Sequence, residues 1–84
     1  MNKETVTVVF YMTKRNIVKD IQIPIYITAN ELVVALNEAY NLNIDTSNVK
    51  NCYLKAEKPI ALLKGNKTLA EFGVRNGTVI IFTE

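Results

Sequence analysis

The chain has 84 residues, of which 49% are hydrophobic and 21% are charged, and its formal net charge is +2. This length allows one small domain, and the composition is that of a folded globular protein rather than a disordered one. No apolar run approaches the roughly 18 to 20 residues of a membrane-spanning helix, and the N-terminus alternates where a signal peptide would carry a continuous apolar block. The single cysteine, Cys52, agrees with a reducing compartment. We therefore expect one cytoplasmic domain over residues 1–84.

Two strands are predicted at the start of the chain. Residues 5–12 alternate with period two, which places Val9 and Tyr11 on the face opposite to the apolar residues at the even positions. After a polar loop of about four residues, the segment 17–27 carries isoleucine at most of its odd positions. Pro24 lies in this second strand, and proline cannot donate a hydrogen bond to a neighbouring strand. The pattern predicts a β-hairpin whose second strand lies at the edge of a sheet.

A helix is predicted after the hairpin. Thr28 and Glu31 have the spacing of a capping box, so the helix should begin at about Ala29. Its apolar stripe, which should pack on the sheet, consists of Leu32, Val33, Leu36, Ala39 and Tyr40. Asn41 or Asn43 can adopt the left-handed conformation that ends a helix.

The second half of the chain contains shorter elements. In chain order we expect a strand over 49–56, a turn at 57–59, a brief strand at 60–63, a helical turn over 68–72 and a last strand over 78–83. The predicted order is thus ββαββ, a short helical turn and β. We expect Val79 and Ile81 of the last strand to face the helix.

The closing segment resembles that of ubiquitin. The resemblance lies in the order of the elements and in the spacing of Thr68, Leu69, Phe72, Val74, Gly77, Val79 and Ile81. It implies an α+β, ubiquitin-like β-grasp fold, with a mixed sheet of four to five strands packed on one helix. Within that superfamily, the length and the passage "IPIYITANELVVALNEAYNLNI" are most similar to the YukD and EsaB proteins of Gram-positive type VII secretion systems. This second resemblance implies a small cytoplasmic accessory protein that acts with a membrane-embedded machine exporting WXG100 proteins.

The C-terminus departs from the ubiquitin pattern. Ubiquitin and the β-grasp sulfur carriers work through a flexible terminal Gly-Gly, whereas this sequence ends in "VIIFTE". Unless the chain is truncated, we expect neither conjugation nor sulfur transfer through Glu84.

The residues of common catalytic sites are scarce. The sequence has no histidine, which excludes a histidine general base, a Ser-His-Asp triad and the commonest metal ligand. Cys52 has no histidine partner and is expected to be a small core residue in a strand, with a reactive role as the alternative. The three glycines form no phosphate-binding motif, and Gly65 and Gly77 fit turns that need positive φ. We expect neither an enzyme nor a bound cofactor or metal.

The strongest candidate for a protein-binding site is the face of the sheet away from the helix. If Val79 and Ile81 face the helix, Ile80 and Phe82 face away from it, beside Val9 and Tyr11 of the first strand. By the resemblance, this corresponds to the main partner-binding surface of ubiquitin. The alternative is that a loop or the fourth strand covers these side chains, or that scattered apolar exposure has no function.

A second candidate is a group of lysines opposed only by Glu57. Its members are Lys50, Lys55, Lys58, Lys64 and Lys67. They could face an acidic protein, lipid head groups or nucleic acid, and an ordinary solvated surface is the alternative. Nucleic acid is disfavoured because the group contains no arginine and only Tyr53 as a stacking aromatic residue.

The sequence therefore predicts a non-conjugated, ubiquitin-like protein-interaction module of a type VII secretion system. Its predicted partner is a membrane-bound secretion subunit or ATPase, and its predicted location is the cytoplasm, including the inner face of the cell membrane. Two alternatives are a ubiquitin-like adaptor in another pathway and a weak RNA-binding β-grasp module.

Overall fold

The structure is a computed structural model that describes residues 4–48 and 50–83. Its elements, in chain order, are β1 (Thr5–Met12), β2 (Ile17–Pro24), α1 (Ala29–Tyr40), β3 (Leu54–Glu57), β4 (Ala61–Leu63), α2 (Leu69–Phe72) and β5 (Val79–Phe82). This is the order predicted from the sequence. Val49, the first residue of the predicted strand 49–56, and the terminal Glu84 lie outside the described residues.

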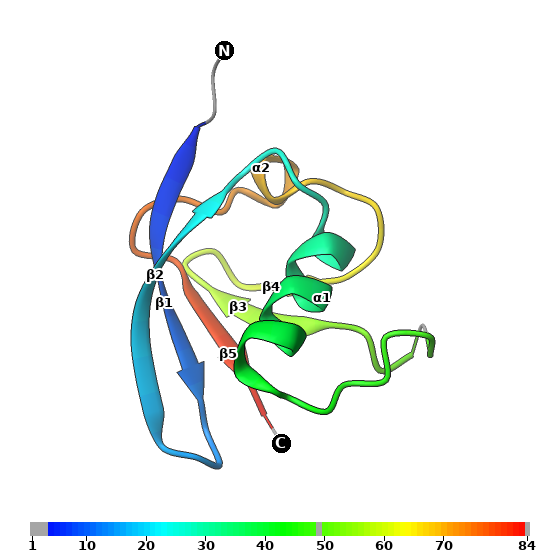
Figure 1. The fold of residues 1–84 in the computed structure, drawn as a ribbon. Helices are drawn as coiled ribbons and strands as arrows, with labels where there is room; N and C mark the ends of the chain where they lie inside the picture. Colours follow the sequence, from blue (N-terminus) through cyan, green and yellow to red (C-terminus); the bar gives the residue numbers. More distant parts are fainter. Residues whose placement is uncertain (1–3, 49, 84) are drawn as a thin grey trace.

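The strands form one mixed sheet in the order β2-β1-β5-β3-β4. β1 and β5 are parallel, and the other neighbours are antiparallel. Figure 1 shows α1 on one side of the sheet, with β1 and β5 running in the same direction beside each other. We call the opposite side of the sheet the open face. The predicted mixed sheet packed on one helix is therefore confirmed.

The hairpin has the predicted edge strand. β2 lies at one end of the sheet and ends at Pro24, earlier than the predicted limit at Ile27. The reason is that the chain then leaves β1 for α2, where the carbonyl groups of Ile25 and Ile27 accept hydrogen bonds from the backbone amides of Ala70 and Leu69.

The helix α1 begins and ends as predicted. The backbone amide of Glu31 donates to Thr28 Oγ1 at 3.1 Å, and the amide of Thr28 donates to Glu31 Oε1 at 2.8 Å. Asn41 ends the helix with φ of 57°. The apolar stripe predicts Ala39 on the buried side of the helix, but Ala39 is exposed. The buried face of α1 consists of Ala29, Leu32, Val33 and Leu36.

A side chain from the hairpin loop stabilises the end of α1. The Arg15 guanidinium donates to the carbonyl oxygens of Tyr40 and Asn41 at 2.7 and 2.9 Å. The last turn of α1 has no basic residue of its own. Arg15 thus supplies both hydrogen-bond donors and positive charge where a helix end has unpaired carbonyl groups and partial negative charge.

The core lies between α1 and the inner face of the sheet. Its largest fully buried side chains are Phe10, Met12, Leu32, Leu54, Leu63, Leu69, Ile80, Val8 and Val33. Ile23 and Leu36, each 5% exposed, belong to the same cluster. The inward placement that the apolar stripe predicted for Leu36 is confirmed.

The predicted orientation of the last strand is wrong. Ile80 is fully buried and lies between Phe10 and Ala56, which are also core residues, so Val79 and Ile81 point to the open face. Phe82, on the same side as Ile80, is half-buried and packs against the core.

A buried hydroxyl precedes Ile80 on the same side of the strand. Thr78 is fully buried, and its Oγ1 donates to the carbonyl oxygen of Lys58 at 2.7 Å while accepting from the amide of Arg75 at 3.0 Å. These bonds satisfy the buried hydroxyl and hold Thr78 inward. Since side chains alternate along a strand, Ile80 then faces inward as well.

The short helix α2 has its own capping box. The amide of Thr68 donates to Glu71 Oε1 at 2.9 Å, and the amide of Glu71 donates to Thr68 Oγ1 at 3.2 Å. The hydrogen bonds from the Thr68 backbone and side chain, with a smaller effect of the nearby charge of Lys67, lower the pKa of Glu71.

Our first prediction tests the core. Leu36→Ala and Ile23→Ala should each lower the free energy of unfolding by about 2 to 5 kcal/mol, because each truncation removes buried surface and leaves a cavity. Val34→Ala on the exposed side of α1, where Val34 is 41% exposed, should change it by less than about 1 kcal/mol. Chemical denaturation measures all three, and equal stability of the core and control variants would contradict the inward assignment.

Our second prediction tests the orientation of β5. Ile80→Asp should lower the free energy of unfolding by about 4 kcal/mol or more, because it places an unpaired carboxyl group in the core. Ile81→Asp should cost only about 1 kcal/mol, mainly from lost β-propensity and packing. Circular dichroism and thermal melting of the two variants distinguish these outcomes. A folded Ile80→Asp beside an unfolded Ile81→Asp would show that the orientation is reversed.

Our third prediction concerns acid stability. Because the pKa of Glu71 is lower in the folded state, its carboxylate favours folding above the usual pKa of 4.5, and this contribution is lost as the pH falls through the folded-state pKa. Glu71→Gln should melt at a lower temperature than the parent at neutral pH and lose less stability on acidification. The measurement is the melting temperature between about pH 3 and 7, with Glu38→Gln as the matched control. If the melting temperature of Glu71→Gln fell as steeply with decreasing pH as that of the parent, the stabilising role of the Glu71 carboxylate would be contradicted.

Candidate protein-interaction face

The sheet register places a nearly continuous apolar row across the open face. Tyr11 in β1 lies between Val18 in β2 and Ile81 in β5. Ile81 is followed by Lys55 in β3, and Lys55 by Leu62 in β4. The row thus crosses all the strands of the sheet, and Lys55 is its one charged member.

A second row runs beside the first, two residues away along each strand. Val9 in β1 lies between Asp20 in β2 and Val79 in β5, and Val79 is followed by Glu57 in β3. This row therefore has an apolar middle and a carboxylate at each side. The two rows together give the open face an apolar centre, defined by Val9, Tyr11, Val79 and Ile81.

The apolar centre continues toward β4. Its four side chains are half-buried, whereas Leu62 is 44% and Ile60 is 90% exposed. A shallow groove joins them, lined by Lys55, Ala56, Glu57, Ile60, Ala61, Leu62 and Ile81. At the opposite edge, Val18 is 59% exposed. Apolar surface therefore extends from β2 to the β3–β4 turn.

Only part of the predicted protein-binding group lies on this face. Val9 and Tyr11 lie there. Ile80 and Phe82 do not, because Ile80 is in the core and Phe82 lies on the inner side of the sheet and packs against the core. Val79 and Ile81 take their places. Nothing in the structure tests whether this face binds a protein, so that role stays a prediction.

The sequence reasoning missed Val79, Ile81, Val18 and Leu62. The first two were assigned to the core because positions 79–82 are all apolar, so the period of the strand gives no indication of which side is inward. Thr78 offered a weak signal, because the hydroxyl of a buried threonine at the start of a strand can form hydrogen bonds with nearby backbone groups. Val18 and Leu62 were recognisable only once the neighbouring strands were known.

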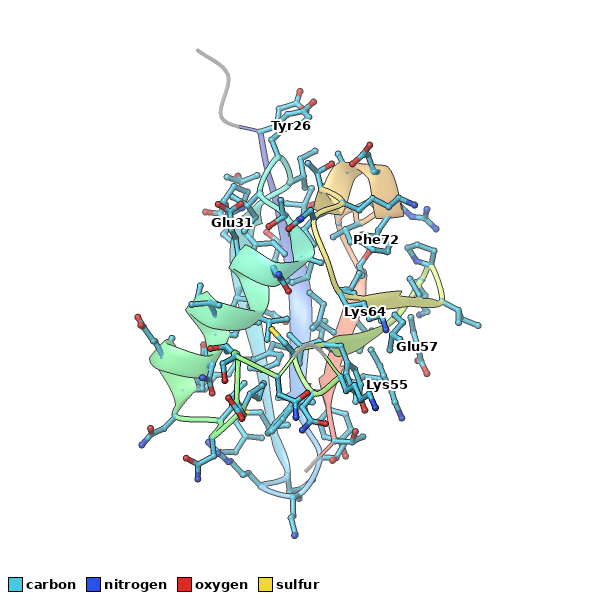
Figure 2. All side chains as sticks on the ribbon, turned by 90° about the vertical axis from the view of Figure 1, so that its right-hand side faces the viewer. Tyr26, Glu31, Lys55, Glu57, Lys64 and Phe72 are labelled. Carbon is cyan, nitrogen blue, oxygen red and sulfur yellow. The ribbon has the colours of Figure 1, made fainter. Side chains whose placement is uncertain are left out.

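The charged side chains of the open face have no partners within the described residues. Within the described residues, the side chains of Lys55, Glu57 and Asp20 form no hydrogen bond or ion pair. Figure 2 shows Lys55 and Glu57 together on β3, on the side of the molecule away from α1. These groups are therefore available to a binding partner.

The five predicted lysines are all exposed but occupy different surroundings. Lys55 lies on the open face, Lys58 in the β3–β4 turn with φ of 63°, and Lys50 in the loop before β3. Lys64 borders a small hollow with Asn30 and Cys52, and the Lys67 ammonium lies 4.9 Å from the centroid of the Phe72 ring. The role of this group in binding an anionic partner stays a prediction.

Cys52 lies in the core and outside any strand, two residues before β3. It is 4% exposed, and its Sγ donates to Asn30 Oδ1 at 3.5 Å. Burial raises the pKa of this thiol. Because the thiolate is the reactive form, this environment suppresses nucleophilic chemistry at neutral pH.

Two further observations concern the described part of the chain. Between residues 4 and 83, leaving out 49, no three carboxylate, thiol or imidazole side chains gather as metal ligands would. In the same residues, neither helix has the length and apolar character to cross a membrane.

Several solved structures share this fold at low sequence identity. The C-terminal ubiquitin-like domain of mouse tubulin-specific chaperone e matches with a TM-score of 0.72 and 15% identity, covering 99% of this chain and 89% of that one. The UBL domain of Plasmodium falciparum Dsk2 matches with a TM-score of 0.64 and 19% identity, covering 93% and 97%. Trypanosoma brucei tubulin-binding cofactor B gives 0.64 and 11%, covering 96% and 95%. These likenesses establish a ubiquitin-like β-grasp fold.

The sequence itself identifies the family. No curated protein matches it significantly. The family model described as "WXG100 protein secretion system (Wss), protein YukD" matches residues 5–82, which is nearly the whole chain. The chain therefore belongs to the YukD family of the WXG100 protein secretion system, and its ubiquitin-like fold is the one that the sequence resemblance implied.

Proposed function

We propose that this protein is a binding module of a type VII secretion system and that it acts through the open face of its sheet. Its partner is a membrane-bound secretion subunit or ATPase, which it meets in the cytoplasm at the inner face of the membrane. The family match supports the secretion system, and the apolar centre of the open face supports the mode of action.

The apolar centre is the observation that carries this proposal. Val9, Tyr11, Val79 and Ile81 lie side by side on two neighbouring strands, on the side of the sheet that α1 leaves uncovered. Contiguous apolar surface rimmed by charged residues is typical of protein-interaction sites. Tyr11 adds an aromatic ring with a polar end, a residue type that is enriched among binding hot spots.

The rest of the molecule is better suited to holding this face in place than to chemistry. The cysteine thiol is buried with a raised pKa. Side chains on a β-sheet have fixed directions and spacing, so a partner meets a preformed surface. A preformed surface binds with less loss of conformational entropy than a flexible one.

Our fourth prediction tests this surface. Ile81→Asp should weaken association with the membrane partner by about 2 kcal/mol or more, because it places a charge in a desolvated contact. Co-purification of the tagged protein with detergent-solubilised membranes from its native cells, quantified by mass spectrometry, measures the loss. The partner should appear as a secretion subunit or ATPase.

The matched control is Val34→Asp on the outer side of α1, where Val34 is 41% exposed. It introduces the same charge on a folded domain and should leave co-purification unchanged. Undiminished recovery of the partner with a folded Ile81→Asp would refute the open face as the binding surface. Enrichment of ribosomal material in place of membrane subunits would refute the secretion role.

A further inference from the structure

The charges beside the apolar centre suggest one kind of partner in particular. Lys55 and Glu57 lie two positions apart on β3, about 6.8 Å along the strand, and both point to the open face. Neither has a side-chain partner within the described residues. They have opposite signs and equal distance from the row between them, which contains Phe10, Ile80 and Ala56.

We propose that the open face binds the open face of a second copy of this chain, about a twofold axis that lies between the two sheets and is parallel to the row Phe10–Ile80–Ala56. In a twofold dimer, each residue contacts the residue related to it by the axis, and the reverse contact follows. Such an axis places the row that contains Tyr11, Ile81 and Lys55 of one copy over the row that contains Val9, Val79 and Glu57 of the other. Lys55 of one copy then faces Glu57 of the other, and the dimer gains two such ion pairs.

The same operation stacks the apolar centres on each other. Tyr11 of one copy lies over Val9 of the other, and Ile81 lies over Val79, since each pair shares a strand on opposite sides of the axis. Two sheet faces that pack in this way lie about 10 Å apart with their strands nearly aligned. The arrangement buries the apolar centre and leaves the charges at its border.

The charges also oppose a symmetric arrangement whose axis runs along the strands. A twofold axis along the strands, between β1 and β5, would exchange β2 with β3 and place Asp20 of one copy against Glu57 of the other. The dimer would then contain two repulsive carboxylate contacts. With the axis across the strands, Asp20 faces Val18 at the edge of the interface, where it stays in water.

The dimer should be weak. The paired surface covers only the middle of a small sheet, and interfaces below about 1,200 Å² of total buried surface are typical of transient association. The free protein therefore dimerises at high concentration and releases its open face to a tighter-binding partner. This inference shares its surface with the proposed function, but its test uses the purified protein alone, so the two can fail separately.

The experiment is sedimentation equilibrium of the full chain from about 20 µM to 1 mM, the range of weak association. The parent should show a concentration-dependent monomer–dimer equilibrium. Lys55→Glu and Glu57→Lys should each raise the dimer dissociation constant at least about tenfold, because symmetry turns one reversal into two like-charge contacts. The double variant Lys55→Glu/Glu57→Lys restores both ion pairs and should return to within about threefold of the parent.

Matched controls make the same charge changes elsewhere. Lys64→Glu and Glu38→Lys lie off the open face and should stay within about threefold of the parent, and thermal melting confirms that every variant is folded. Asp20→Lys should likewise have little effect. A parent that is monomeric to 1 mM, or a double variant no tighter than the single ones, would overturn the proposal. Tighter association of Asp20→Lys would overturn it in favour of the axis along the strands.

Discussion

The parallel pairing of β1 with β5 determines which side chains reach each face of the sheet. Backbone hydrogen bonds hold this pairing along its whole length. At one end the amide of Gly77 donates to the carbonyl of Thr7 at 3.0 Å, and at the other end the amide of Thr13 donates to the carbonyl of Phe82 at 3.1 Å. Between them, the amide of Val9 donates to the carbonyl of Thr78 at 2.9 Å. A shift of one residue would turn every side chain of β5 to the other face.

This register connects stability with the candidate site. It pairs Phe10 with Ile80 inside the core, and the next pair of the register sets Tyr11 beside Ile81 on the open face. The Asn76 Oδ1, which accepts from the amide of Thr7 at 2.8 Å, and the buried Thr78 hydroxyl secure the start of β5. Residues that never touch a partner therefore position the surface that we propose binds one.

The sequence predicted those elements whose signals are local. The capping box at Thr28 marks a helix start through hydrogen bonds between residues three apart, and Pro24 marks an edge strand through its missing amide. The orientation of β5 depended on contacts with distant strands, and its four consecutive apolar residues carry no period-two pattern. Consequently, only half of the candidate site was predicted. Val9 and Tyr11 were placed on the correct face because β1 alternates, whereas Ile80 and Phe82 were placed on the wrong face because β5 does not.

The most direct test of this account is methyl NMR of isoleucine-labelled protein in the presence of a soluble paramagnetic agent. The Ile81 methyl signal should broaden and show cross-peaks to the Tyr11 ring, because both side chains lie on the open face. The Ile80 methyl signal should stay sharp and show cross-peaks to Phe10, because Ile80 is fully buried. Broadening of Ile80 with protection of Ile81 would contradict the register, and with it the composition of the proposed binding surface.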